Sequence, residues 1–431
     1  MTQPPAPGKR AQAHAALDDW VQAHFDEQVA FLQSLVRVPT DTPPGDNAPH
    51  AEHTARALQA MGLAVQRLPV PAAAVQAKGL RSIVNLLVRH PMGPGGPTVA
   101  LNAHGDVVPP GEGWHHDPYG GEVVDGRLYG RAAAVSKSDF ATYTFALRAL
   151  DHVARSQSLT LAGTVELHFT YDEEWGGELG PEWLLAQGHT RPDLLMAAGF
   201  SHEVVVAHNG CLQLEVSVQG EMAHAAFPDS GTDALQGAVH LMQALYAVNR
   251  ELLAVRSALP GIDHPYLNIG WMQGGTHTNV VPGQAVFKLD RRLIPEEDPQ
   301  AVEADLRARI EAAARGHQPA RGGRELQVRV RRLLLAQALQ PSPGQAPLVA
   351  ALQKHGQAVF GHRLAAVGTP LYTDLRLYGA RGIPGVAYGA GPRTVRESNA
   401  KRADEHVTLD DLQGATRVVA RVLLDLMQPG A

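Results

Sequence analysis

The first half of the chain alternates short apolar runs with stretches in which apolar residues recur at helical spacing. Such runs are typical of strands buried in a mostly parallel sheet, and the spacing between them is typical of amphipathic helices. We expect strands near 63–68, 82–89, 99–104 and 164–170, and helices near 13–38, 51–61, 138–153 and 181–187. This alternation predicts an α/β domain in which helices are layered on a mostly parallel sheet.

The pattern changes after Gly210, where apolar and polar residues begin to alternate strictly. Alternation is typical of antiparallel strands that expose one face. Strands near 212–219, 267–271, 285–292 and 326–335 and helices near 233–255 and 299–314 follow the order strand, helix, strand, strand, helix, strand. That order predicts a ferredoxin-like α+β domain at 211–336, inserted into a larger domain formed by 13–210 and 337–431.

Two of the apolar runs end in residues that carry chemistry. His104-Gly-Asp106 follows one run, and Glu173 with Glu174 follows another. Ligands of α/β folds collect at the carboxyl ends of the strands, so we expect these side chains to share one crevice. One histidine with several carboxylates is the donor set of a metal-assisted hydrolase.

The composition narrows the range of partners and compartments. The net charge is -6 and no strongly basic block is present, so nucleic acid is not expected as a partner. The single cysteine, Cys211, excludes an internal disulfide. No apolar run approaches the ~18 residues that span a membrane. The first residues lack the basic-then-apolar pattern of a signal peptide, and a cytoplasmic protein without a membrane partner is expected.

Several motifs in register resemble the zinc-dependent exopeptidase and deacylase family that includes aminoacylase, acetylornithine deacetylase and succinyl-diaminopimelate desuccinylase. The resemblance covers nearly the whole chain. Its motifs are His104-Gly-Asp106-Val-Val-Pro109, Asp125-Gly-Arg-Leu-Tyr-Gly-Arg131, Asp172-Glu-Glu-Trp-Gly-Gly177, Gly220-Glu-Met-Ala-His224, Gly274-Gly-Thr-His-Thr-Asn279, Asp290-Arg-Arg292 and Thr373-Asp-Leu-Arg376. It implies an α/β catalytic domain and an inserted lid domain that usually mediates homodimerisation.

The resemblance also implies roles for the residues of the expected crevice. His104 matches a zinc ligand, and Asp106 matches the carboxylate that orients it. Such an orienter is expected because a ligating imidazole needs its other nitrogen held. Glu173 matches the general base, and Glu174 matches a second zinc ligand.

Further matches imply substrate contacts. His224 and Asn279 match lid residues that reach toward the scissile carbonyl, His224 commonly across the dimer. Arg292 and Arg376 match positions that bind the substrate carboxylate or have structural roles. The substrate implied is a small acylated amino acid or a dipeptide-like molecule.

Three positions depart from the family's pattern of metal ligands. Val135 stands where an aspartate bridges two metal ions, and its branched alkyl group cannot ligate. Gly199 replaces the acid that follows a later strand. Lys401 replaces the histidine expected four residues before Glu405, and an ammonium has no lone pair. We therefore expect an impaired or absent binuclear site.

Other residues nearby leave alternatives open. Asp139, His202 and Glu203 are candidate replacements for the missing ligands. Lys401 is a candidate substitute of another kind, because its ammonium would balance the charge of Glu173 and Glu174. One zinc or other divalent ion on His104 and Glu174 is therefore one alternative, and a metal-free site is the other.

Three functional hypotheses follow. The first is an amide-bond hydrolase with Glu173 as general base. The second is a metal-independent acid/base enzyme that uses Glu173 and Lys401, the latter stabilising an oxyanion. The third is a catalytically silent dimer that binds amino-acid-like ligands and keeps the cluster as a structural ion-pair network.

Overall fold

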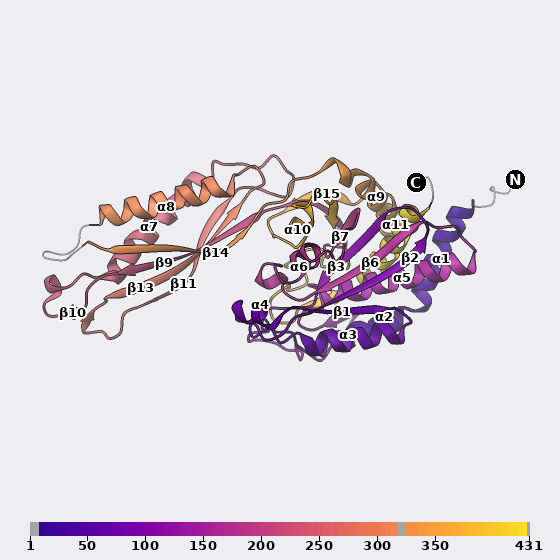
Figure 1. Cartoon of the computed structure of the whole chain (residues 1–431), viewed down its shortest axis with the longest axis horizontal. Coiled ribbons are helices and arrows are strands. Elements are labelled where there is room, and N and C mark those ends of the chain that lie inside the picture. The colour runs from indigo at the N-terminus through magenta and orange to yellow at the C-terminus, as the bar shows by residue number, and fades with distance from the viewer. Residues whose placement is uncertain (1–7, 318–324, 429–431) are drawn as a thin grey trace. The chain divides into compact units, whose positions relative to one another are not determined.

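The chain folds as two compact units in the computed structural model, which describes residues 8–317 and 325–428 (Figure 1). The larger unit comprises Met1–Val206, Pro341–Val367 and Thr373–Ala431, and the smaller one comprises Ala207–Gln340 and Gly368–Tyr372. The first seven residues, on which the expectation of no signal peptide rests, lie outside the described residues. Among the described residues, every helix is too short or too polar to cross a membrane.

An eight-stranded mixed sheet forms the centre of the larger unit, in the order β1-β2-β6-β3-β7-β16-β8-β15. The strands are β1 Val65–Pro69, β2 Val84–Gly93, β3 Thr98–His104, β6 Gly163–Thr170, β7 Leu194–Ala197, β8 Glu203–His208, β15 Ala365–Thr369 and β16 Gly385–Ala387. The central pairs β6–β3, β3–β7 and β7–β16 are parallel, whereas β1 and β2 pair antiparallel at one side. The parallel centre confirms the expected α/β class.

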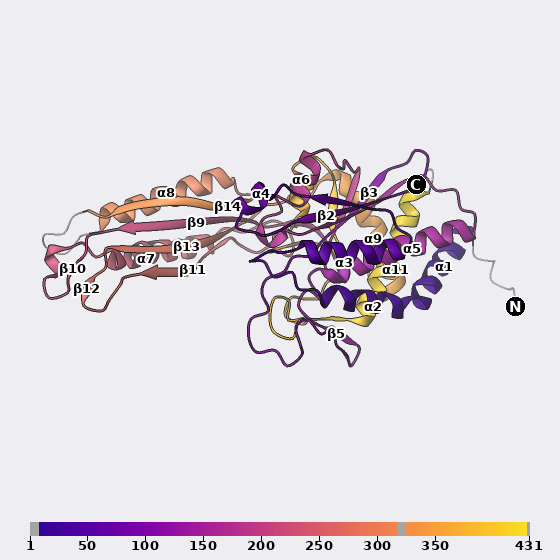
Figure 2. The ribbon, with the colours of Figure 1, turned by 60° about the horizontal axis from the view of Figure 1, so that its bottom comes forward.

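Helices pack on this sheet and on one another. They are α1 Lys9–Ala23, α2 Phe25–Val36, α3 Ala48–Ala60, α4 Ala72–Ala77, α5 Lys137–Ser156, α6 Pro181–Ala186, α9 Ala346–Phe360, α10 Leu375–Gly379 and α11 Leu409–Met427. Helix α5 contacts β3 and β6, and α11 packs on α1, α5 and α9 (Figure 2). A small sheet of β4 Val123–Val124, β5 Arg127–Tyr129 and β17 His406–Thr408 lies apart from the central sheet.

The long helix expected over 13–38 is two helices that meet at His24. His24 leaves the helical conformation with φ -111° and ψ 14°. Its Nδ1 lies 2.8 Å from the Trp20 carbonyl oxygen, and its ring stacks on the Trp20 indole. Apolar spacing continues through the break, which is why the sequence pattern did not reveal it.

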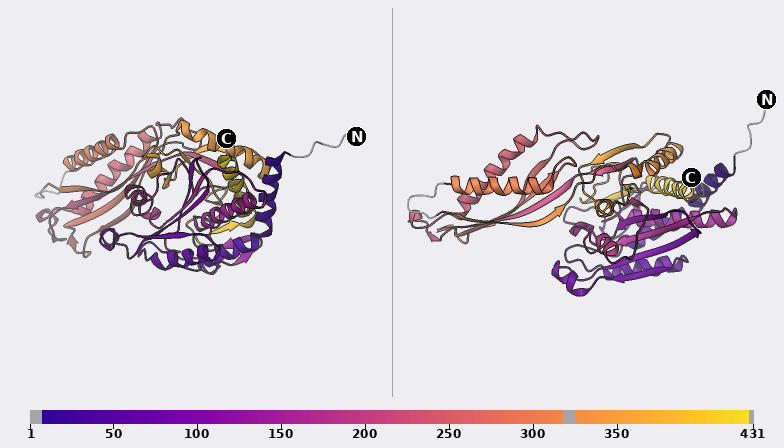
Figure 3. Two further views of the ribbon diagram at one scale, coloured as in Figure 1. Left: turned by 45° about the vertical axis from the view of Figure 1, so that its right-hand side comes forward. Right: turned by 45° about the horizontal axis from the view of Figure 1, so that its top comes forward.

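The smaller unit is a four-stranded antiparallel sheet in the order β11-β13-β9-β14, with two helices on one face (Figure 3). Its main elements are β9 Gly210–Gln219, α7 Ala234–Leu252, β11 Tyr266–Gly274, β13 Gln284–Leu293, α8 Pro299–Gly316 and β14 Gln327–Ala336, with β10 Ala223–His224 and β12 Val280–Val281 forming a separate pair. Alternate residues of β9, such as Leu214 and Val216, are fully buried in its core. The order of these strands and helices along the chain confirms the predicted ferredoxin-like order.

Candidate active site

The ends of β3 and β6 bring His104 and the acidic segment together. The two strands are parallel neighbours, and His104 is in register with Thr170, the last residue of β6. Just beyond, the 3-10 helix Glu173–Trp175 carries both glutamates. The Nε2 atom of His104 lies 3.9 Å from Oε2 of Glu173. Adjacent strand ends thus form one cluster in the larger unit.

Asp106 holds this cluster in place. Its fully buried carboxylate accepts hydrogen bonds from the backbone N–H groups of Glu173 (3.2 Å) and Glu174 (3.0 Å). The same carboxylate lies 3.5 Å from Nδ1 of His104, and the Asp106 carbonyl oxygen lies 3.0 Å from that nitrogen. One residue therefore positions the imidazole and both glutamates.

Lys401 completes the cluster from a distant part of the sequence. Its Nζ lies 2.6 Å from Oε2 of Glu174. The Lys401 side chain is 49% exposed, whereas that of Glu174 is 8% exposed, so the ammonium lies at the mouth of the site. The backbone of Lys401 is left-handed, with φ 62°. Its N–H donates to Glu405 at 3.2 Å, which fixes the loop that presents the ammonium.

The charges of the cluster respond to one another. Burial opposes protonation of His104, but Glu173, Asp106 and Glu174 outweigh it and raise the pKa of His104 to about 10. Burial likewise opposes the charge of Lys401, and Glu174 and Glu173 outweigh it and raise that pKa. Burial raises the pKa of Glu174, and the Lys401 ammonium works against that rise. An imidazolium and an ammonium thus face the three carboxylates.

Glu405 holds two loops together, a role that the sequence did not predict. In the sequence, Glu405 served only to locate the position of Lys401. It is buried and pairs with Arg131 Nη1 at 2.5 Å. Its Oε1 accepts from the N–H groups of Ala134 (3.1 Å) and Val135 (3.2 Å), while Oε2 accepts from Lys401. A single carboxylate therefore ties together the two loops that carry Val135 and Lys401.

Three positions that the family resemblance assigns to metal ligands, Val135, Gly199 and Lys401, carry no side chain that ligates a metal ion. Val135 offers only hydrocarbon, and Lys401 offers a cation that is already bound to Glu174. At Gly199 an added Cβ would lie 2.6 Å from backbone atoms of Ala387 and Tyr388, so the local packing has no room for any side chain. Of the expected ligands, His104 and Glu174 are present.

The candidate replacements have other partners. Asp139, in the first turn of α5, is buried and accepts from the Ala390 N–H at 2.6 Å, and burial raises its pKa to about 7. His202 lies 2.8 Å from Asp411 through Nε2. Glu203 is the first residue of β8 and is half-buried. These contacts account for Asp139 and His202 without a metal ion.

Ser136 and Lys137, at the start of α5, each form hydrogen bonds with backbone groups. The Ser136 hydroxyl donates to the His104 carbonyl oxygen at 2.8 Å and accepts from the His104 N–H at 3.0 Å. The buried Lys137 ammonium donates to the carbonyl oxygens of Leu35 (3.1 Å) and Val38 (2.9 Å). Ser136 therefore supports the strand end that carries His104.

Arg376 lies next to the acidic turn. Its Nη2 donates to the Gly176 carbonyl oxygen at 2.5 Å, directly after the 3-10 helix. Asp374, two residues earlier, is buried, and burial together with Glu173 raises its pKa. The N-terminal end of α10 thus supports the turn that carries Glu173.

The other predicted substrate contacts belong to the smaller unit. His224 and Asn279 are exposed and lie on adjoining segments, because His224 pairs with Val280 and the Asn279 carbonyl oxygen accepts from the Ala225 N–H. Arg292 lies near the other end of β13. It donates to Asp290 at 2.7 Å, and its guanidinium is 5.6 Å from the Tyr372 ring centroid.

His224, in the β10–β12 pair, follows the Gln219 end of β9, whereas Arg292 pairs with the other end of β9. Gln284, at one end of β13, pairs with Gln219, whereas Arg292 pairs with Cys211 eight residues away. At ~3.3 Å per residue these pairs are roughly 26 Å apart. Arg292 therefore lies far along β13 from the end that adjoins the segment of His224.

The fold and the acidic cluster together define a hydrolase with a catalytic α/β unit and a separate α+β unit. The family described as Peptidase family M20/M25/M40 matches residues 100–425. The chain belongs to this family.

Similar proteins cover most of the chain. A succinyl-diaminopimelate desuccinylase of Methylorubrum extorquens is 28% identical over 417 residues, which is 92% of this chain and 97% of the relative. Among solved structures, human carnosine dipeptidase 1 has a TM-score of 0.77 at 17% identity and covers 98% of this chain and 99% of its own. The Bacillus subtilis YXEP protein, described as a dinuclear metal binding peptidase, has a TM-score of 0.63 at 18% identity and covers 94% and 99%.

Proposed function

We propose that this protein hydrolyses the amide bond of a small acylated amino acid or dipeptide-like substrate, with Glu173 as general base and without a binuclear metal centre. The observation that carries the proposal is the contact of 2.6 Å between Lys401 and Glu174. It lies in the crevice where the family resemblance predicts metal ligands, and the similar YXEP protein is described as a dinuclear metal binding peptidase. The substrate class is supported by membership of the family and by the desuccinylase relatives.

Glu173 is suited to take a proton from water. Its backbone N–H donates to Asp106, and its carboxylate, 12% exposed, lies 3.9 Å from the His104 imidazole. The water oxygen attacks the amide carbon, and its proton passes to Glu173. Collapse of the tetrahedral intermediate breaks the C–N bond, and Glu173 returns the proton to the departing nitrogen.

Lys401 and His104 are suited to stabilise the oxygen that becomes negative. The ammonium has three N–H donors, of which Glu174 takes one. A preorganised donor at a developing oxyanion typically lowers the activation free energy by ~3–4 kcal/mol. Lys401 thus supplies charge stabilisation, while Glu174 holds it in position.

A single divalent ion on His104 and Glu174 is the alternative that this proposal opposes. Such an ion would have only these two protein ligands, and it would have to displace the ammonium from Glu174. Charge repulsion and the small number of ligands both disfavour it.

His224 and Asn279 are proposed to contact the substrate of a partner subunit in a homodimer. The support is their exposure and their distance along the sheet from Arg292. Arg292 and Arg376 are proposed to bind the substrate carboxylate or to support the turns that contact it. For Arg376 the supporting role is favoured, because it donates to the Gly176 carbonyl oxygen beside the turn after Glu173.

The test is an assay of the Glu173→Gln variant on a panel of N-succinyl amino acids, N-acetyl amino acids and dipeptides. Loss of the general base is expected to lower kcat by 10²–10⁴-fold on whichever substrate the wild type cleaves. Glu178→Gln is the matched control, because Glu178 is five residues away and pairs with Lys78 on the surface. Equal activity of both variants, or a wild type inactive on the whole panel, would favour the silent ligand-binding dimer instead.

A further inference from the structure

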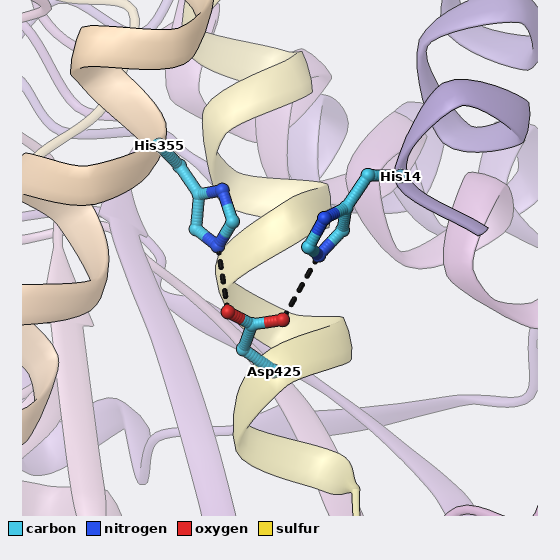
Figure 4. Close-up of side chains that lie close together, drawn as sticks. All are labelled: His14, His355 and Asp425. Carbon is cyan, nitrogen blue, oxygen red and sulfur yellow. Dashed lines mark hydrogen bonds and ion pairs between the residues drawn. The ribbon is translucent and has the colours of Figure 1, made fainter. Parts of the chain in front are cut away.

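A second group of metal-ligating side chains lies outside the crevice. His14 of α1, His355 of α9 and Asp425 of α11 converge in the larger unit (Figure 4). Nε2 of His14 is 2.9 Å from one Asp425 oxygen, and Nε2 of His355 is 2.8 Å from the other. One ligand atom from each residue lies within 4.8 Å of the other two, a spacing that no other group of three His, Cys, Asp or Glu residues shares in the described part of the chain.

The three side chains are buried and converge. His14 is 9% exposed, His355 1% and Asp425 7%. The two imidazole rings are edge-on, with centroids 4.8 Å apart and planes at 74°. Both rings turn Nε2 toward the Asp425 carboxylate, and each Nε2 faces a different oxygen of it (Figure 4).

His355 is not fully explained by hydrogen bonding. Its Nδ1 is buried and has no hydrogen-bond partner among the described residues. The nitrogen that His355 turns toward the group is Nε2, which lies 2.8 Å from Asp425.

Two partly exposed cations, Arg10 and Lys354, form ion pairs with the Asp425 carboxylate. Arg10 Nε lies 2.8 Å from Oδ1 of Asp425, and Lys354 Nζ lies 2.7 Å from Oδ2. Their side chains are 48% and 57% exposed, so each has a path into solvent. A carboxylate has about four lone-pair positions, and a metal ion needs one of them. The cations therefore compete with a metal ion without enclosing the site.

We propose that His14, His355 and Asp425 bind one divalent transition-metal ion of the zinc class. Two imidazoles and one carboxylate are a set that zinc accepts, with water at the fourth position. Tetrahedral ligands with metal–ligand bonds of ~2.0–2.2 Å lie roughly 3.4 Å apart. A pair of ligand atoms at 4.8 Å would therefore have to close by roughly 1.4 Å, through rotation of the two histidine side chains. The ion would fasten α1 to α9 and α11.

The site is independent of the catalytic proposal, and the experiment keeps the two apart. The full chain carrying His104→Ala, which removes the metal-ligating side chain of the crevice, is stripped with chelator and dialysed against micromolar zinc. One equivalent of zinc is expected to be retained, with a rise in Tm of about 3 °C. Retention of no zinc and no change in Tm would overturn the proposal.

Added variants in that background locate the ion. His14→Gln and His355→Gln are each expected to lose the bound equivalent and the zinc-dependent rise in Tm. His90→Gln is the matched control, because His90 pairs with Asp151 at 3.0 Å in a histidine–carboxylate pair. Equal retention in all three variants would contradict the assignment. If His355→Gln does not fold, His14→Gln, on the first helix, decides alone.

Discussion

Lys401 and Glu174 are 227 positions apart in the sequence, and their charged atoms lie 2.6 Å apart. This contact occupies the region where the family's metal ligands would gather, and it rests on Glu405, which binds the Lys401 backbone. We therefore expect the catalytic consequence of changing Lys401 to exceed that of changing an ordinary surface lysine.

Replacing Lys401 tests its role at the oxyanion. Lys401→Met keeps much of the length of the side chain and removes the charge, so kcat should fall by about 10²–10³-fold while KM changes little. Arg402→Met is the control, because Arg402 is exposed and adjacent. Steady-state kinetics on the cleaved substrate distinguish the two. Unchanged kcat in Lys401→Met would remove Lys401 from the mechanism.

Asp106 should act on catalysis through its neighbours. Asp106→Asn keeps the size of the side chain but weakens the acceptors that hold the Glu173 and Glu174 N–H groups. We expect kcat to fall by at least tenfold, with a smaller change in KM, because the base and the imidazole lose their fixed positions. Kinetics of the variant at several pH values check this. A change confined to KM would contradict a positioning role.

Gly199 should not tolerate a side chain. Gly199→Ala places a Cβ 2.6 Å from the backbone at Ala387 and Tyr388, so the free energy of unfolding should fall by about 1–3 kcal/mol. Urea denaturation measures the change. Gly316→Ala, where an added Cβ has no neighbour within 4 Å, should be close to neutral. Equal effects at both positions would show that the packing at Gly199 can yield.

The stability of the larger unit should depend on Glu166 in acid. Burial opposes its charge, but His168, Thr190 and Arg89 outweigh burial and lower the pKa of Glu166 to about 2. The folded pKa lies below the unfolded value of about 4.3, so this stabilisation is present above that pH and is lost as the pH falls toward 2.

Glu166→Gln should therefore cost on the order of 2 kcal/mol near pH 6 and about half as much near pH 3. Urea denaturation at the two pH values gives the difference. Asp151→Asn is the control, since Asp151 forms more exposed pairs with His90 and Arg155. A deficit in Glu166→Gln that does not shrink toward pH 3 would contradict the assignment.

The dimer proposal predicts complementation between subunits. His224→Ala and Glu173→Gln should each be nearly inactive alone, because each removes one half of a shared site. Mixing and reassembling them should restore up to about a quarter of the wild-type activity per total site, since half the subunits are in heterodimers and each heterodimer has one intact site. Activity of mixtures, measured after exchange of subunits, provides the test. Mixtures that remain inactive would place His224 outside the partner's site.

Particular elements show how far the sequence could lead. The parallel pairing of β3 and β6 followed from two apolar runs, and it explains why His104 and Glu173 meet at one edge of the sheet. The ferredoxin-like order followed from alternating apolar and polar residues in the strands and from helical spacing in the two segments between them. These are local patterns, which a single sequence carries directly.

Other features depend on contacts between distant segments. The break at His24 comes from its contacts with Trp20, which apolar spacing does not encode. The same holds for the four contacts of Glu405 and for the meeting of His14 with His355, because each needs the tertiary fold to bring loops or helices together. Lys401 could be aligned from the sequence, but only the fold shows which acid it contacts.

The zinc content of the crevice tests the central claim most directly. Wild type and His104→Ala, both purified without chelator and dialysed against micromolar zinc, are compared by metal analysis, so that any ion bound elsewhere cancels in the difference. We predict no difference in zinc between the two proteins, together with full wild-type activity in the presence of chelator. A wild type that holds two more equivalents of zinc than His104→Ala, and loses its activity when they are removed, would contradict the account.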